Sequence, residues 1–186
     1  MKTLIVTNVY CDKEVNKAKI FNDRFGDDFR IVTHLDIGFG KVWKVDDYNK
    51  RTVEWTKRIL RKFLEEPYDV LLKIDPDVII KSVPEMPLNC DVAGDFRKPS
   101  VGWIWFGACQ YYTRSAVERI LSDALYTGKC MYQDVELAKV IKRLSLKAYN
   151  MEEVDMWCEK DSPALITHRS QVFIQRLSSG PITMTD

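Results

Sequence analysis

The fold is decided by residues 68–80, which read YDVLLKIDPDVII. The stretch begins as an apolar strand at Val70-Leu71-Leu72, breaks at Asp75-Pro76-Asp77, and resumes with apolar residues. Such a run is typical of a buried strand in a parallel sheet. The proline removes a backbone N–H and fixes one φ angle, so it stiffens the loop. We therefore expect two carboxylates at the carboxyl end of a strand, which is the edge where open α/β sheets bind ligands.

Further strands and helices alternate along the chain on both sides of this stretch. Apolar, β-rich runs predict strands at residues 2–10, 29–35, 91–96, 103–112 and 146–150. Helical spacing of apolar residues predicts helices at 13–25, 49–64, 115–125 and 133–144, with Asn49 as an N-cap. This alternation predicts an α/β fold with a mainly parallel sheet and helices on both faces. At 186 residues, we expect one domain over residues 1–186.

Composition excludes several classes of protein. Hydrophobic residues make up 46% and charged residues 30%, as in an ordinary globular domain. The formal net charge of +1 gives no bulk electrostatic reason for binding nucleic acid or an anionic membrane. No apolar run approaches the roughly 20 residues that cross a bilayer. The five cysteines include no C-x-x-C pair, which argues against a zinc site and favours a reduced, cytoplasmic protein.

The two aspartates at the strand end suggest a metal site. Neighbouring carboxylates repel one another unless a cation compensates their charge, and hard oxygen ligands favour Mg²⁺ or Mn²⁺. Such an ion can hold a diphosphate and neutralise the charge that grows on it as a leaving group. The structural alternative is an Asp-Pro turn without a metal, in which the second aspartate, Asp77, is exposed to solvent.

The order of these elements resembles the nucleotide-sugar glycosyltransferases of the GT-A fold. Three later segments add to the likeness. Residues 105–116, WFGACQYYTRSA, resemble the strand and helix on the acceptor side of that fold. Residues 132–136, YQDVE, resemble a D-x-x motif at a helix start, with Gln133 where many inverting members have Glu, and His168 resembles a late metal-binding histidine. The resemblance covers residues 2 to about 169 and implies a Rossmann-like GT-A domain that transfers a hexosyl or pentosyl group.

The resemblance also implies roles for individual residues. Asp75, Asp77 and His168 are expected to bind Mn²⁺ or Mg²⁺. Asp134 is expected to be the general base that deprotonates the acceptor hydroxyl, because a base needs hydrogen-bond reach and a suitable pKa. Glu136 is the alternative base, and helix capping is the structural alternative for Asp134.

The donor is expected at the edge of the sheet where the first strand ends. Thr7, Asn8 and Tyr10 lie there, and in the resembling fold this edge receives the base and ribose. Tyr10 could stack on uracil, which favours a UDP-sugar. Lys57, or its neighbour Arg58, is expected against the donor phosphates, although a lysine on an apolar helix face usually extends outward to water. Asp75 is also expected to contact the donor.

Other readings of the same residues stay open. The acceptor hydroxyl is on a glycan, a protein or a hydroxylated DNA base. The motif Asp75-Pro76-Asp77-Val78 also fits the nucleophile loop of haloacid-dehalogenase-like phosphatases, with Asp75 as nucleophile. That family normally carries the motif on its first strand, whereas two strand–helix units come first here. A third reading is a sugar-nucleotide-binding module without catalytic activity.

Overall fold

In the computed structural model, the described residues are 1–9, 12–33, 45–97, 104–128, 133–156 and 163–168. None of the helices in these ranges has the length and hydrophobicity needed to span a bilayer. The elements follow one another in this order: β1 (Thr3–Val9), α1 (Asp12–Phe25), the short 3₁₀ helix η1 (Gly26–Asp28), β2 (Phe29–Thr33), α2 (Val45–Leu64), β3 (Val70–Ile74), β4 (Val78–Ile80), β5 (Val92–Arg97), β6 (Ile104–Thr113), α3 (Arg114–Ser122), α4 (Gln133–Arg143), β7 (Ala148–Asn150), β8 (Val154–Asp155) and β9 (Ile166–His168).

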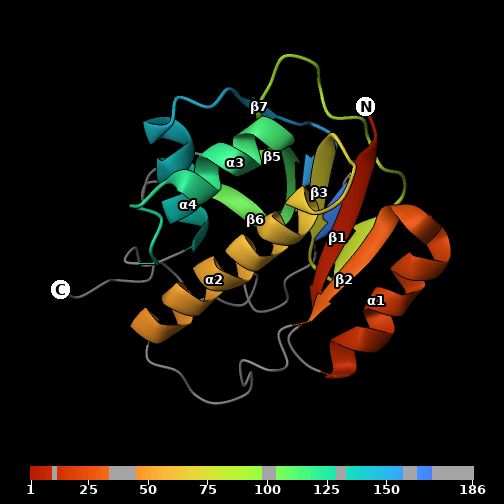
Figure 1. The fold of residues 1–186 in the computed structure, drawn as a ribbon. Coiled ribbons are helices and arrows are strands. Elements are labelled where there is room, and N and C mark those ends of the chain that lie inside the picture. The colour runs from red at the N-terminus through yellow and green to blue at the C-terminus, as the bar shows by residue number, and fades with distance from the viewer. Residues whose placement is uncertain (10–11, 34–44, 98–103, 129–132, 157–162, 169–186) are drawn as a thin grey trace, which may run out of the picture.

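The main sheet has the strand order β2-β1-β3-β6-β5-β7 (Figure 1). β1 pairs in parallel with β2 and β3, and β7 pairs in parallel with β5. β6 runs antiparallel to both of its neighbours, β3 and β5. Among the described strands of this sheet, all except β6 therefore point the same way, which confirms the predicted mainly parallel α/β sheet. A smaller sheet has the order β4-β9-β8.

Strand alternation divides the core between the two faces of the main sheet. Leu4 and Val6 pack in a cluster with side chains from α2, α3 and α4, whereas Ile5 packs with Phe21 of α1 and with side chains from β4, β8 and β9. The period-2 direction of side chains along a strand produces this division. Helices thus lie on both faces, as predicted, whereas the smaller sheet that covers one face together with α1 was not predicted.

Three boundaries differ from the predictions. Helix α2 begins at Val45, so Asn49 lies inside the helix and does not cap it. Helix α3 ends at Ser122, where the Asp123 carboxylate accepts from the Leu125 N–H and turns the chain. The strand expected from Tyr68 begins at Val70, and the predicted break at Asp75-Pro76-Asp77 separates β3 from β4, which lie in different sheets. The turn leaves Asp75 at the carboxyl end of β3, at the centre of the main sheet.

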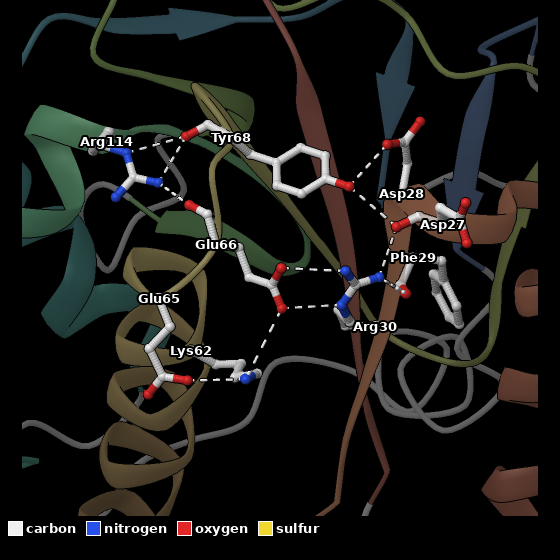
Figure 2. A network of polar contacts seen from close by, with 9 residues as sticks. All are labelled: Asp27, Asp28, Phe29, Arg30, Lys62, Glu65, Glu66, Tyr68 and Arg114. Carbon is white, nitrogen blue, oxygen red and sulfur yellow. Dashed lines mark hydrogen bonds and ion pairs between the residues drawn. The ribbon is translucent and has the colours of Figure 1, made fainter.

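A polar network fixes the opposite end of β3 (Figure 2). The Arg30 guanidinium on β2 pairs with the Glu66 carboxylate, with an Nε–Oε1 distance of 3.0 Å. The Arg114 guanidinium at the start of α3 donates to the carbonyls of Leu64, Glu66 and Tyr68. The bond to Leu64 satisfies a carbonyl at the end of α2 that has no helical partner, and the bonds to Glu66 and Tyr68 hold the segment that leads into β3. The network therefore anchors the entry to β3, while the other end of the strand carries Asp75.

Candidate functional site

Asp75 sits at the junction of three strands. Its backbone N–H donates to the Ala108 carbonyl of β6 across 2.9 Å, which extends the β3–β6 pairing by one residue. Its Oδ1 atom lies 2.8 Å from Lys73 Nζ and 3.1 Å from Nδ2 of Asn8, the penultimate residue of β1. The Asp75 side chain keeps 28% exposure. The parallel pairing of β1 and β3 thus brings Asn8 and Asp75 together at one edge of the sheet, as predicted.

Lys73 is a functional candidate that the sequence analysis missed. Its side chain is buried, and its ammonium group donates to Asp75 and to the Gly107 carbonyl on β6. A buried ammonium is costly unless it is paired and hydrogen-bonded. In the sequence, the feature that could have identified it is a single lysine inside the otherwise apolar run of β3. Lys73 supplies part of the positive charge that the sequence analysis assigned to a metal ion alone.

Asp134 reaches the same site from the first turn of α4. The Gly107 N–H donates to its carboxylate, and a Cβ added at Gly107 would lie 2.6 Å from Asp134 Oδ1. Only glycine at this position allows α4 to approach β6 so closely. Burial raises the pKa of Asp134 to about 6; the Asp75 charge also raises it, whereas the Lys73 charge and the Gly107 hydrogen bond lower it. A carboxylate with this pKa is suited to accept a proton near neutral pH.

Two side chains hold α4 in place. Gln133 Nε2 donates to the Thr56 hydroxyl on α2 across 3.1 Å. Glu136 is buried, and its Oε1 accepts from the backbone N–H groups of Thr127 and Gly128 at 2.8 and 2.9 Å. These bonds hold the Glu136 carboxylate against the backbone of the segment that precedes α4, so this carboxylate is already occupied as a hydrogen-bond acceptor. Asp134 is therefore the better-placed of the two predicted bases.

The predicted metal ligands lie along one turn and one strand pair. Asp77 is exposed in the turn, and the β4–β9 register places the backbone of His168 opposite Val78, the residue after Asp77. Within the part of the chain that the structure describes, Lys73 and Asn8 both donate to Oδ1 of Asp75, and Oδ2 is available to a further ligand. Carboxylates with an imidazole suit Mn²⁺. Among the described side chains, which exclude that of His168, no three potential metal ligands gather.

Three further residues, Thr7, Lys57 and Tyr10, were predicted to bind the donor. Thr7 is fully buried, and its hydroxyl donates to the Ile74 carbonyl across 3.0 Å, so it reinforces the β1–β3 pairing. Lys57 Nζ lies 3.7 Å from Glu54 Oε1 and 5.3 Å from the centre of the Tyr126 ring. Tyr10 lies outside the described residues. The donor roles of these three residues stay predictions.

Comparison with known proteins agrees with the fold. No protein-family model matches the chain, and no curated protein sequence matches it. Among solved structures, the chain is similar to the crystal structure of a glycosyltransferase involved in the glycosylation of the major capsid of PBCV-1. The TM-score is 0.62 at 10% sequence identity, and the match covers 97% of this chain and 100% of that chain. At 10% sequence identity, this similarity shows a shared fold and nothing more.

Replacement of Lys73 by methionine should destabilise the protein and leave Asp75 without its ammonium partner. We expect the free energy of unfolding in urea to fall by roughly 1–3 kcal/mol, because a buried hydrogen-bonding group loses its partner. The variant Lys73→Met/Asp75→Asn should recover part of this loss, because the unpaired charge is gone. Lys19→Met, at an exposed site on α1, is the matched control. A Lys73→Met variant as stable as this control would contradict the assignment.

The raised pKa of Asp134 predicts a pH-dependent stability difference. Because the folded state binds this proton more tightly than the unfolded chain, the contribution is fully present below pH 4 and is lost as the pH rises through about 6. In metal-free protein, Asp134→Asn should therefore gain stability relative to wild type between pH 4 and pH 7, on the order of 2 kcal/mol. Urea titrations at several pH values measure this. A difference that stays constant across the range would contradict the predicted shift.

Proposed function

We propose that this protein is a metal-dependent glycosyltransferase that moves a hexosyl or pentosyl group from a nucleotide-diphosphate sugar to an acceptor hydroxyl. The observation that carries the proposal is the grouping of Asp75, Lys73 and Asp134 at the carboxyl end of the central strand β3. Ligands of open α/β sheets bind at this edge. The fold-level likeness to a glycosyltransferase supports the same reading. A UDP-sugar is the favoured donor.

The metal-binding part of the proposal rests on Asp75, Asp77 and His168, which would hold Mn²⁺ or Mg²⁺. Their donor atoms fit these ions. The bound ion would supply positive charge for the diphosphate as it becomes a leaving group. Lys73 holds the Asp75 carboxylate through Oδ1, and Asn8 donates to the same oxygen. The two donors fix the orientation of the carboxylate before any ligand arrives.

The proton-transfer part of the proposal rests on Asp134. With a pKa of about 6, its carboxylate is mostly ionised at pH 7 and can take the proton of an acceptor hydroxyl. The Gly107 N–H and the tether from Gln133 to Thr56 keep the carboxylate and its helix in one position. Such a fixed base favours inversion at the transferred sugar. Asn8 at the end of β1, together with the predicted Thr7, Tyr10 and Lys57, would serve the donor.

Replacement of Asp77 by asparagine tests the proposal, because it removes the metal-binding charge from an exposed position that carries little packing. We expect at least roughly 10-fold weaker Mn²⁺ binding and a parallel loss of UDP-sugar hydrolysis, with an unchanged melting temperature of the metal-free protein. His168→Ala should weaken Mn²⁺ binding in the same way. Isothermal titration with Mn²⁺ and assay of UDP release measure the two effects.

Asp23→Asn, at an exposed site on α1, provides the matched control and should behave as wild type. Full UDP release by the wild-type protein in excess EDTA would refute metal dependence. Equal Mn²⁺ binding by wild type and Asp77→Asn would remove Asp77 from the proposed metal site.

A further inference from the structure

A second polar site lies at the same edge of the sheet, on the far side of β6 from Asp75. It is a pocket of about 360 Å³, whose lining includes Asp95, Phe96, Arg97, Asn150, Glu152 and Asp155. β5 and β7 run parallel to β3, so their carboxyl ends share its edge. At about 4.8 Å per strand, β5 lies about 10 Å from β3. Asp95 and Arg97 lie on the face covered by the smaller sheet and Asp75 lies on the helix-covered face, so a substrate that reaches both sites would pass over the edge of the sheet between them.

A buried carboxylate orients the guanidinium group of this pocket. Asp95 is buried, its Oδ1 and Oδ2 accept from Arg97 Nε and Nη2 at 2.8 and 3.0 Å, and Oδ2 also accepts from the Met156 N–H. Arg97 Nη2 also lies 2.8 Å from Asp155 Oδ1. The bidentate pair fixes the plane of the guanidinium. The Arg97 side chain is still 42% exposed, and its Nη1 has no acceptor among the described residues.

Two further side chains of the pocket are also held in place. The Asn150 Oδ1 accepts from the Phe96 N–H across 2.8 Å, which leaves the amide Nδ2 as a donor. The Phe96 ring stacks on the buried Trp105 ring, with centroids 5.0 Å apart and planes 7° apart. Because the Phe96 ring packs toward the helix side of the sheet, the polar groups carry the match: the held amide of Asn150 and guanidinium of Arg97 present donors suited to the hydroxyl groups of a sugar.

The charge of the pocket restricts its ligand. Its lining has three carboxylates, Asp95, Glu152 and Asp155, and one guanidinium, that of Arg97, for a formal net charge of −2. A surface of this sign repels phosphate groups and hence a nucleic-acid backbone. We infer that this pocket binds a neutral saccharide, and that it is the acceptor subsite of the enzyme. The second part of this inference rests on the proposed function.

Saturation-transfer NMR on the protein without metal or donor tests the pocket independently of catalysis. The probes are methyl α-D-glucopyranoside and methyl β-D-galactopyranoside, with a single-stranded oligothymidylate as the anionic competitor. We expect at least one glycoside to bind and the oligonucleotide to leave it bound. Glu152→Ala and Arg97→Lys should each weaken this binding roughly 2- to 10-fold, the value of one hydrogen bond. Glu118→Ala, at an exposed site on α3, is the matched control and should bind as wild type.

Glu152 is exposed, so its replacement should leave the fold intact, and a melting curve checks Arg97→Lys for the same property. The inference is overturned if neither glycoside binds, if both variants bind as wild type, or if the oligonucleotide displaces the sugar. Hydrolysis of a UDP-sugar with Mn²⁺ is assayed in parallel. Glycoside binding without hydrolysis would refute the transferase and keep the saccharide pocket, whereas hydrolysis without glycoside binding would refute the pocket alone.

Discussion

The functional edge of this protein depends on one buried ammonium group. Lys73 lies inside the central strand β3, yet its Nζ atom reaches the Asp75 carboxylate and the Gly107 carbonyl of the next strand. Its charge also lowers the pKa of Asp134, against the burial that raises it. A buried charge must be paired, and here the Asp75 carboxylate and the Gly107 carbonyl on β6 supply the partners. The same group therefore stabilises the fold and sets the electrostatics of the candidate site.

Strand β6 divides the edge into two halves with different chemistry. On its β3 side are Asp75 and, through Gly107, Asp134, where the charge pattern suits a cation and a proton transfer. On its β5 side, Asp95 and Arg97 line the saccharide pocket. The β5–β6 register shifts between Gly94 and Phe96, and this irregularity falls at Asp95. Irregular pairing next to a functional site commonly redirects a side chain. In the proposed glycosyltransferase, the two halves would serve the donor and the acceptor.

The sequence predicted the parts of the fold that depend on local pattern. β1, α1, β3 and α4 follow runs of apolar spacing, and the structure places them within a few residues of the predictions. The ends of β1 and β3 were expected at one edge of the sheet, whereas the Asp75–Asn8 hydrogen bond is seen only in the structure. Lys73 could not be assigned in this way, because its burial and its bond to the Gly107 carbonyl on β6 arise only from tertiary packing. The pocket at Arg97 was missed for the same reason: it joins β5 to residues more than fifty positions later. Asn49 was misassigned because α2 begins earlier than its apolar pattern.

The metal ion that we propose at the end of β3 would join the protein to a nucleotide diphosphate. Electron–nuclear double resonance on the protein with Mn²⁺ and UDP tests this claim directly, because Mn²⁺ reports the nuclei of its own ligands. The account predicts ³¹P couplings from the diphosphate together with a ¹⁴N coupling that disappears in His168→Ala. A spectrum identical to that of Mn²⁺ and UDP without protein would contradict it.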